Sequence, residues 1–401
     1  MPCILITVSG ADHPGITAAL TSILAQHQAV ILDMEQVVVQ ERLSLSILIR
    51  GDRSSSSGTL KDLLFAAKEH GNDLDFRVLD PGTSRRQAHS PYVLTLLGDP
   101  ELDAEAVSAI SRVLATHGIN IEKIEKLSER RFATLEMTIG IPGDADVRAV
   151  RAALLERAAR LDVDVALQAE GLFRRAKRLV VFDLDSTLIR GEMLDLLGDR
   201  LGVGERIAGI TRRAMRGEID YATSLRERVA LLKGTPIAEH EDLASPVQLR
   251  PRALELARPL HRLGFKTAIV SGGLLPVAEV LRRRLGVALV HANEVEVESG
   301  ELTGRVLEPV LDAASKGRIV RDLATRNGIT LDQVIAVGDG ANDLPMLEAA
   351  GLGIAFHAHD TVQERARHVL NRTRLDSILF LLGISERDLQ ALQQEEVDAQ
   401  P

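Results

Sequence analysis

Three uninterrupted apolar runs in the second half of the chain constrain its fold more than any other feature. They occupy residues 179–182, 267–270 and 334–337, and residues 352–356 are a further candidate. The runs lack the apolar–polar alternation of a half-exposed strand, so each predicts a strand that is buried on both faces. Helical stretches separate the runs, and this order is typical of a parallel sheet flanked by helices. We therefore expect an α/β core.

Residues 190–250 interrupt this alternation of strands and helices. They contain no convincing strand pattern and are rich in Leu, Arg, Glu and Ala, most of which favour helices. We interpret them as a helical insertion after the first strand of a core that covers residues 171–385. A turn before the strand at Leu179 predicts that this core folds on its own. The polar residues after about 385 predict a frayed end.

A repeated pattern organises the first 170 residues. The pattern Leu-Ala-x-His at residues 24–27 recurs at 114–117, and Ile31 and Glu35 recur at the same displacement of 90 residues. Within the first copy, strand-like runs and helical periodicity follow one another in the order βαββαβ, which indicates a small α+β sandwich. The repeat predicts two such domains, at residues 1–82 and 92–170, joined by a linker with Pro and Gly at about 81–91.

The charge and composition of the chain exclude several classes of protein. Acidic residues outnumber basic ones, 57 to 48, and the net charge of −9 argues against binding to nucleic acid or to an anionic membrane. Cys3 is the single cysteine, so neither an internal disulfide nor a cysteine-rich zinc site can form. No apolar run approaches the roughly 18 residues of a membrane span, and the N-terminus does not resemble a signal peptide. We therefore expect a cytoplasmic protein.

Two aspartates directly follow the first apolar run, in the segment Asp183-Leu184-Asp185-Ser186-Thr187. Carboxylates at this end of a buried strand reach the crevice where open α/β sheets bind ligands. One of them can stay ionised, bind a hard cation and act as a nucleophile. The other can take a raised pKa and serve first as an acid and then as a base. Chance alone produces such a pattern about 0.1–0.2 times in a chain of this length, so the motif needs support.

Two further segments at the ends of apolar runs provide part of that support. The run at 334–337 is followed by Gly338-Asp339-Gly340-Ala341-Asn342-Asp343, and the run at 267–270 by Ser271-Gly272-Gly273. Glycines let the backbone approach a ligand closely, and a hydroxyl beside free N–H groups suits a phosphate oxygen. Taken singly, the first segment is equally well an acidic turn and the second an ordinary Ser-Gly turn.

A cation completes the set. Lys316 precedes an amphipathic helix, although a lone lysine is usually a solvated surface residue. Taken together, the four segments supply what phosphoryl transfer requires: a nucleophile, an acid or base, ligands for Mg²⁺, a hydroxyl and a cation for the phosphate.

This set of segments resembles the haloacid-dehalogenase superfamily of phosphatases, whose members form an aspartyl-phosphate intermediate. Glu192 and the segments 214–217 and 224–229 are similar to the cap of the phosphoserine phosphatases in that superfamily. The resemblance spans about residues 179–375 and implies a Rossmann-like core with an inserted helical cap at about 190–250. The N-terminal copies resemble ACT domains, which commonly bind amino acids in metabolic enzymes.

The resemblance to the phosphatases implies a role for each motif residue. Asp183 would be the nucleophile, and Asp185 would protonate the leaving oxygen and then activate water. Mg²⁺ would be held by the Asp183 carboxylate, the Asp185 main-chain carbonyl, Asp339 and, directly or indirectly, Asp343. The phosphoryl group would be bound by Ser271, Gly272, Lys316 and Asn342. Glu192 would face the ammonium group of the substrate, and Arg228 its carboxylate.

The resemblance to ACT domains implies regulation and assembly. Residues 10–15 of the first copy look like the ligand loop of such a domain, with Gly10, Asp12 and Gly15 as the candidate regulatory residues. The second copy reads Gly-Asp-Pro-Glu at 98–101 and lacks the Pro-Gly step. We expect an amino-acid effector, with serine as the candidate, and a homodimer or higher homo-oligomer.

The function expected from the sequence is Mg²⁺-dependent hydrolysis of O-phospho-L-serine to L-serine and phosphate, the last step of serine biosynthesis. Two alternatives stay open. One is a phosphotransferase of the same superfamily that passes the phosphoryl group to another small alcohol. The other is an amino-acid sensor built on ACT domains with an inactive hydrolase core, although the presence of Asp183, Asp185, Lys316 and Asp339 argues against it.

Overall fold

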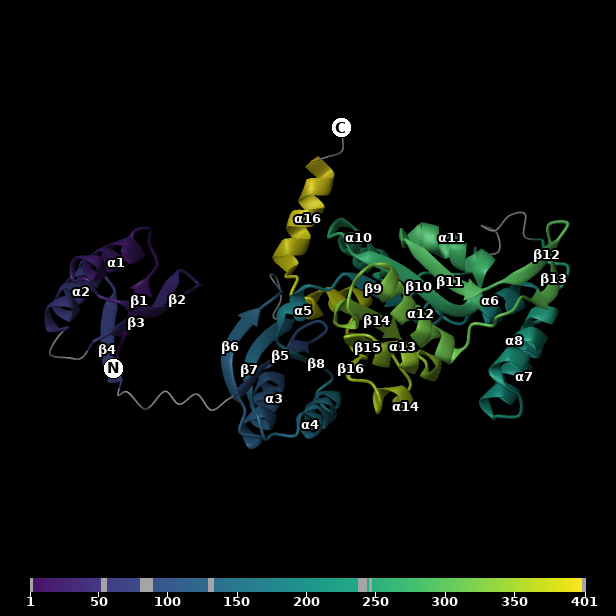
Figure 1. Cartoon of the computed structure of the whole chain (residues 1–401), viewed down its shortest axis with the longest axis horizontal. Coiled ribbons are helices and arrows are strands. Elements are labelled where there is room, and N and C mark those ends of the chain that lie inside the picture. Colours follow the sequence, from purple (N-terminus) through teal and green to yellow (C-terminus); the bar gives the residue numbers. More distant parts are fainter. Residues whose placement is uncertain are drawn as a thin grey trace. The chain divides into compact units, whose positions relative to one another are not determined.

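The computed structural model describes residues 3–51, 56–79, 89–128, 133–236, 244 and 247–398 (Figure 1). The chain divides into two compact units, Met1–Gln87 and Ala88–Pro401. The expected linker lies largely outside the described residues. Within the described part of the chain, no helix is both long and apolar enough to cross a membrane.

The first unit is an antiparallel four-stranded sheet with two helices packed on one face. The strand order is β2-β3-β1-β4, and the elements are β1 (Cys3–Ala11), α1 (Ile16–Gln26), β2 (Ile31–Val39), β3 (Arg42–Arg50), α2 (Ser57–Glu69) and β4 (Asp73–Leu79). Alternate residues of β1, namely Ile4, Ile6 and Val8, are buried in one cluster with Leu24 of α1 and Leu63 of α2. This alternation gives the sheet one apolar face, as the βαββαβ pattern predicts.

The second copy of the repeat has the same topology. Its strand order β6-β7-β5-β8 reproduces that of the first copy, and Leu114 is buried in its helix as Leu24 is in the first. The predicted repeat is therefore confirmed. The elements are β5 (His89–Leu97), α3 (Ala104–Thr116), β6 (Asn120–Lys126), β7 (Thr134–Pro142), α4 (Val147–Ala159) and β8 (Asp164–Ala169).

The parallel sheet of the core forms as the apolar runs predict. Its strand order is β11-β10-β9-β14-β15-β16, and every neighbouring pair is parallel. The strands are β9 (Leu179–Phe182), β10 (Lys266–Leu274), β11 (Leu289–Asn293), β14 (Val334–Gly338), β15 (Leu352–Phe356) and β16 (His368–Leu370). The four residues of β9 are all buried, which is why the run shows no polar alternation.

Helices cover both faces of this sheet. Val180 and Phe182 of β9 pack in one cluster with α10 (Ala253–Arg262) and α11 (Leu275–Leu285). Leu179 and Val181, whose side chains point the other way, pack with α12 (Ala313–Arg326) and α13 (Leu344–Ala349). Shorter elements complete the core: α14 (Asp360–Gln363), α15 (Ile378–Leu381) and the 3-10 turns Leu331–Gln333, Ala341–Asp343 and Leu375–Ser377.

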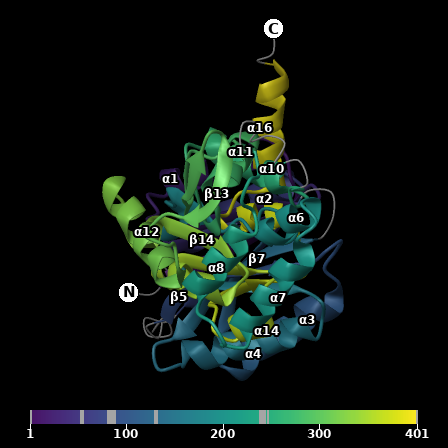
Figure 2. The same cartoon turned by 90° about the vertical axis from the view of Figure 1, so that its right-hand side faces the viewer.

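The predicted helical insertion contains α6 (Met193–Arg200), α7 (Gly204–Met215) and α8 (Tyr221–Ala230), which lie toward the viewer in Figure 2. Residues 237–243 and 245–246 of the expected segment lie outside the described residues. The structure adds a hairpin that we did not predict, β12 (Val295–Glu298) and β13 (Glu301–Val306), which contacts α8. Its turn places Ser299 at φ 52° and Gly300 at φ 84°, the left-handed values that a two-residue hairpin turn needs.

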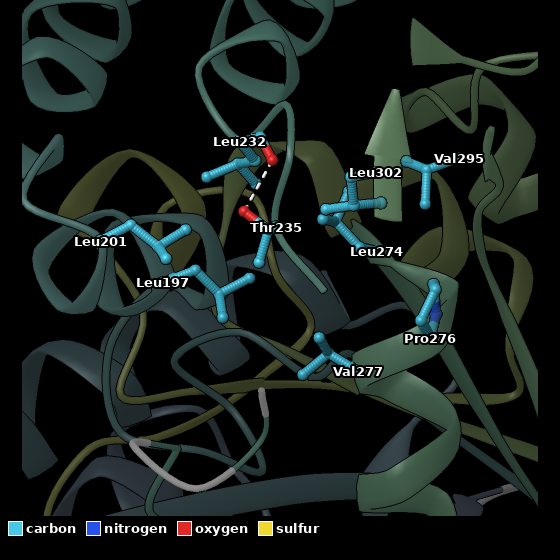
Figure 3. Close-up of a pocket in the computed structure, with 9 residues that line it drawn as sticks. All are labelled: Leu197, Leu201, Leu232, Thr235, Leu274, Pro276, Val277, Val295 and Leu302. Atoms are coloured by element: carbon cyan, nitrogen blue, oxygen red, sulfur yellow. Dashed lines mark hydrogen bonds between the residues drawn. The ribbon is translucent and has the colours of Figure 1, made fainter. Parts of the chain in front are cut away.

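The insertion and the core enclose a small apolar void, which Figure 3 shows. Its volume is about 10 Å³, and it is lined by Leu197, Leu201, Leu232, Thr235, Leu274, Pro276, Val277, Val295 and Leu302. The hydroxyl of Thr235 donates to the carbonyl oxygen of Leu232 at 2.6 Å, so the polar atom of this side chain is satisfied locally. A void of this size has no room for a substrate, so the chemistry must be sought elsewhere.

The second copy and the core share one sheet, which the sequence did not predict. Strand β8 pairs antiparallel with β16 at Val165 and Val369, and this joins the two sheets into ten strands. A buried ion pair between Glu136 of β7 and Arg174 of α5 (Leu172–Arg175) reinforces the junction. The carboxylate of Asp164 also accepts hydrogen bonds from the chain segment after β16.

The expectation of a frayed end after residue 385 is wrong. Residues Glu386–Asp398 form the helix α16. Ser385 and Asp388 cap its first turn reciprocally, because the Asp388 N–H donates to the Ser385 hydroxyl and the Ser385 N–H to the Asp388 carboxylate. Such a capping box stabilises a polar helix that has little apolar surface to bury.

Candidate active site

The catalytic motifs converge because their strands are neighbours in the parallel sheet. Strand β9 lies between β10 and β14, and its last residue, Phe182, pairs with Ile269 on one side and Val337 on the other. The motifs at the carboxyl ends of these three strands therefore lie at the same edge, although residues 271–273 belong to β10 itself rather than following it as the sequence predicted. The Asp183 N–H donates to the Val337 carbonyl at 2.8 Å, which continues the pairing one residue into the loop.

Lys316 is held at the centre of the motifs rather than in solvent. Its Nζ donates to Asp183 Oδ1 at 2.5 Å and to Asp343 Oδ1 at 2.6 Å, and its side chain is only 2% exposed. Burial alone would lower the pKa of Lys316, but the charges of Asp183 and Asp343 overcome this effect and raise it. The lysine is therefore a permanent cation at this site.

Asp183, Asp339 and Asp343 each place a carboxylate oxygen within 4.8 Å of the others. Burial, followed by the charge of Asp343, raises the pKa of Asp183 well above its ordinary value and that of Asp339 to about 6. The cluster has three carboxylates and one lysine, which bonds to only two of them, so a divalent cation would neutralise surplus negative charge. A donor set made only of oxygens suits a hard cation such as Mg²⁺. Both oxygens of Asp343 already accept hydrogen bonds, because its Oδ2 accepts from the Gly340 N–H at 3.0 Å.

Asp185 lies beside this cluster with a different set of partners. Its Oδ1 accepts from the Met193 N–H at 2.7 Å, and its Oδ2 accepts from the Ser271 hydroxyl at 3.3 Å. Burial, followed by the charge of Glu192, raises the pKa of Asp185 to about 7. Asp183 is bound to a permanent cation and Asp185 to neutral donors, so the two carboxylates of the motif have distinct environments.

A cavity of about 780 Å³ opens over these groups. Asp183, Asp185 and Asp339 line it from the core, and Glu192, Tyr221 and Arg228 line it from the insertion. Burial raises the pKa of Glu192, and the hydrogen bond from Ser186 and the positive charge of Arg228 oppose that shift. An acidic and a basic group thus face the same space above the carboxylate cluster.

The remaining predicted phosphate-binding residues lie at or beside this cavity. Asn342 and Gly272 line it, whereas Ser271 is fully buried beneath it. The Ser271 hydroxyl also accepts from the Gly273 N–H at 2.9 Å, so that N–H is not available to a ligand. A Cβ atom at Gly272 would lie 2.5 Å from the Tyr221 hydroxyl, which donates to the Gly272 carbonyl at 3.0 Å. The glycine is therefore needed for close contact with the insertion.

Comparisons with known proteins agree with this arrangement. A family model described as haloacid dehalogenase-like hydrolase matches residues 180–348, and two ACT domain models match residues 3–77 and 90–168. A phosphoserine phosphatase of Mycobacterium tuberculosis is 42% identical over 390 residues, which are 97% of this chain and 95% of that one. A phosphoserine phosphatase of Streptomyces coelicolor is 39% identical and covers 98% of this chain and 94% of its own.

The chain belongs to the phosphoserine phosphatase family of haloacid dehalogenase-like hydrolases.

Solved structures support the same membership. The crystal structure of a haloacid dehalogenase family hydrolase from Salmonella enterica serovar Typhi has a TM-score of 0.64 and 31% identity, and covers 73% of this chain and 98% of that one. A probable phosphoserine phosphatase from Vibrio cholerae has a TM-score of 0.57 and 28% identity, and covers 78% of this chain and 91% of its own.

Several residues of the phosphoserine phosphatase site were missed by sequence reasoning. The Thr187 hydroxyl, fully buried, donates to Asp339 Oδ1 at 3.0 Å and orients that carboxylate. Asp195 lines the cavity, and the charge of Arg228 opposes the rise that burial causes in the pKa of Asp195. Residues 359–362 also line the cavity. Thr187 sits within the motif of the two aspartates, so its position in the sequence could have revealed it, whereas the others depend on tertiary packing.

The candidate regulatory residues of this family member all lie in the first unit. Gly15 precedes α1 at φ 101°, a left-handed conformation that favours glycine. Asp12 is exposed, and its N–H donates to the Glu41 carbonyl at 2.9 Å. Gly10 lies at the end of β1 against Asn72, where a Cβ atom would come within 2.5 Å of the amide nitrogen. The loop thus leaves the Asp12 side chain exposed.

Proposed function

We propose that the chain hydrolyses O-phospho-L-serine to L-serine and phosphate through an aspartyl-phosphate intermediate on Asp183. One observation carries the proposal. A nucleophile bound to a buried lysine faces a cavity that Glu192 and Arg228, a pair of opposite charges, line from the insertion, beside a second carboxylate, Asp195. A phosphate group beside Lys316 leaves the ammonium and carboxylate of serine to meet this pair of opposite charges.

The reaction has two steps. In the first, an oxygen of Asp183 attacks phosphorus, the bond from phosphorus to the serine oxygen breaks, and Asp185 gives its proton to that oxygen. In the second, a water molecule gives a proton to Asp185 and attacks the phosphorus of the acyl phosphate, which releases phosphate and restores the Asp183 carboxylate. Lys316 stabilises charge on the phosphoryl oxygens throughout.

The acidic cluster fits Mg²⁺, which would be held by Asp183, Asp339, the main-chain carbonyl of Asp185 and, directly or through water, Asp343. When bound, the ion supplies positive charge to the phosphoryl group. The protein's own contribution is orientation. Thr187 directs Asp339, and Lys316 with the Gly340 N–H directs Asp343.

The nucleophile is tested by Asp183→Asn, which keeps the volume of the side chain but cannot form an acyl phosphate. We expect phosphate release from O-phospho-L-serine to fall below detection, while the folded protein is retained by circular dichroism. Near-normal release by this variant would refute the mechanism. Measuring phosphate release by the unaltered protein, with and without small alcohols such as homoserine, separates hydrolysis from phosphoryl transfer to another alcohol.

Substrate specificity is tested at Arg228, with Arg226 as a matched control on the same helix. Arg226 pairs with Glu308 and does not line the cavity. Losing the partner of a buried carboxylate costs about 2 kcal/mol or more, so Arg228→Gln should lower kcat/KM for phosphoserine about 30-fold or more. An aryl phosphate without a carboxylate should be affected little. Equal losses on both substrates would show that Arg228 does not recognise serine, and Arg226→Gln should change neither.

Regulation by an amino acid is the second part of the proposal. Membership of the ACT domain family and the exposed Asp12 beside Gly15 support serine as a ligand of the first unit, and we propose that the chain assembles as a homodimer or higher homo-oligomer. We expect Asp12→Ala to weaken inhibition by serine and Asp75→Ala, an exposed aspartate of β4, to leave it unchanged. If both variants are inhibited like the unaltered protein, serine acts only as a product at the active site.

A further inference from the structure

A second cavity, of about 400 Å³, lies between the second copy of the repeat and the core. Tyr92 of β5, Arg151 of α4 and the end of β8 line it from the repeat. From the core it is lined by Lys177, which precedes β9, by Gly351, which precedes β15, and by Arg367, which precedes β16. These residues stand at the amino ends of the parallel strands. The cavity therefore lies at the edge of the sheet opposite to the catalytic carboxylates.

Its cations have few counter-ions. The Arg151 guanidinium makes one long hydrogen bond, from Nη2 to the Leu167 carbonyl at 3.4 Å, and its buried Nε has no partner. Arg151 and Arg367 line the same cavity, and burial, followed by the positive charge of Arg367, lowers the pKa of Arg151. Among the described residues, no carboxylate forms an ion pair with either arginine.

Two acidic residues line the cavity, Glu170 and Asp332, against the four cations Arg151, Arg174, Lys177 and Arg367, so positive charge remains in excess. Glu170 is engaged by Arg174 at 3.4 Å, and Arg174 itself is fully buried against Glu136. Lys177 donates to the main-chain carbonyl of Asp332 at 2.5 Å, and burial lowers the pKa of Lys177 to about 8 although Asp332 opposes the shift. Arg151 and Lys177 are half-buried and Arg367 is exposed, so an anion could reach all three and would offset their mutual repulsion.

His368 also lies at the wall of this cavity, but neither of its ring nitrogens is left for a ligand. Its two ring nitrogens lie 3.2 Å from the Gly353 carbonyl and 3.0 Å from the Leu167 carbonyl, so both nitrogens face acceptors. A neutral imidazole has one N–H and can donate to only one of them. Burial, followed by the charge of Arg151, nevertheless lowers the pKa of His368 to about 4. An anion beside Arg151 would cancel the repulsion that opposes the second proton.

We propose that this cavity, which we name the seam site, binds a multiply charged oxyanion, either inorganic phosphate or a small phosphate monoester. Arg151, Arg367 and Lys177 supply the charge, and planar guanidinium groups match phosphate oxygens with paired N–H donors. Because Arg151 belongs to the repeat and the other two cations to the core, the bound anion clamps these parts together. The seam site is independent of the proposed reaction.

The test is calorimetric titration of inorganic phosphate into the full-length protein, at constant ionic strength set with NaCl. The active site also binds phosphate, so variants identify the second site. We expect the unaltered protein to bind two phosphates per chain. The double variant Arg151→Gln/Arg367→Gln should bind one, or bind the second at least tenfold more weakly. Arg148→Gln removes an exposed arginine from the same helix as Arg151 and should still bind two. If the double variant and this control bind phosphate alike, the proposal is overturned.

A second measurement tests the seam site in the unaltered protein, so the result does not depend on folding of the double variant. The low pKa of Lys177 makes its amine reactive toward acetylating reagents near pH 8, and bound phosphate should block it. We expect phosphate to slow acetylation of Lys177 at least fivefold, as read by mass spectrometry, and to leave the exposed Lys61 unaffected. Equal rates at Lys177 with and without phosphate would overturn the proposal. Methylphosphonate, which cannot be hydrolysed, replaces phosphate in a parallel arm, and stronger protection by it identifies a monoester as the better ligand.

Discussion

Asp164 joins the second repeat to the core through a single carboxylate. This residue begins β8 and is 4% exposed. Its Oδ1 accepts from the Asn371 N–H at 2.9 Å. Its Oδ2 accepts from the Arg372 N–H at 3.0 Å, the Thr373 N–H at 2.9 Å and the Thr373 hydroxyl at 2.8 Å. Four donors of one chain segment, more than 200 residues away in sequence, therefore depend on one side chain.

The variant Asp164→Asn replaces one carboxylate oxygen with an NH₂ group of the same size. Whichever way the amide turns, its NH₂ group meets at least one N–H that formerly donated to oxygen, and the remaining bonds lose the assistance of charge. A buried donor without a partner costs about 1–3 kcal/mol, and weakening of the other bonds adds to this. We therefore expect the free energy of unfolding of the second unit to fall by about 2–4 kcal/mol.

Tyrosine fluorescence is a selective probe of this change. The chain has no tryptophan and only two tyrosines, Tyr92 and Tyr221, and both lie in the second unit. Urea unfolding followed by this signal reports the second unit alone. Asp162→Asn is the matched control, because Asp162 is 78% exposed and pairs with Arg372 of the same segment at 2.9 Å. An exposed pair contributes about 0–1 kcal/mol. If Asp164→Asn costs no more than Asp162→Asn, the carboxylate does not hold the junction.

Three further predictions concern other parts of the second unit: the strand β8, Thr187 and His368. A chain that begins at Gly171 lacks β8, so we expect it to fold but to unfold at a lower urea concentration than a chain that begins at Ala88. Equal midpoints would show that β8 does not stabilise the core. Thr187→Val should raise the Mg²⁺ concentration for half-maximal phosphate release about 10-fold or more, because Asp339 loses its orienting donor, and an unchanged requirement would contradict this role. Burial lowers the pKa of His368 to about 4, so the unfolded chain binds the extra proton and stability falls as the pH drops below about 6.5. The free energy of unfolding should fall by about 2 kcal/mol between pH 7 and pH 5 because of this group. Urea unfolding should show this fall in the unaltered protein but not in His368→Gln. Parallel pH profiles of the two proteins would refute the low pKa of His368.

The parallel core was predictable because its sequence signal is local. A strand such as β9, whose four residues are all buried, must be apolar throughout. The motif that follows it in the sequence must then lie at an edge of the sheet. The repeat was predictable for a similar reason, since equivalent buried positions such as Leu24 and Leu114 carry the same residue type. The hairpin of β12 and β13 was missed because its strands are short and half exposed, which leaves little periodicity to detect.

The site residues also differ in whether the local sequence or tertiary packing determines their position. Asp183, Asp185 and Asp339 follow strands directly, so adjacency of the strands brings them together. Asp195 and residues 359–362 reach the cavity through packing of the insertion and of a loop far along the chain, and no local pattern encodes that placement. Lys316 is intermediate. Its presence together with the other three segments supported a role, but only tertiary structure shows that it is buried between two carboxylates.

The two copies of the repeat differ most at the strand that ends each of them. In the first copy, β4 reads Asp-Leu-Asp-Phe-Arg-Val-Leu and leaves its charged residues exposed, as the edge of a sheet that stays unpaired typically does. In the second, β8 reads Asp-Val-Ala-Leu-Gln-Ala and buries every residue but the last. Its two polar side chains form hydrogen bonds with the core. Asp164 accepts from the segment after β16, and Gln168 donates to the Leu381 carbonyl at 3.0 Å. The same topology thus yields a separate unit in one copy and an extension of the catalytic sheet in the other. From β8 the sheet runs through β16 and β15 to β14, and Asp339 directly follows β14, so the seam site and the catalytic carboxylates lie at two edges of one continuous sheet.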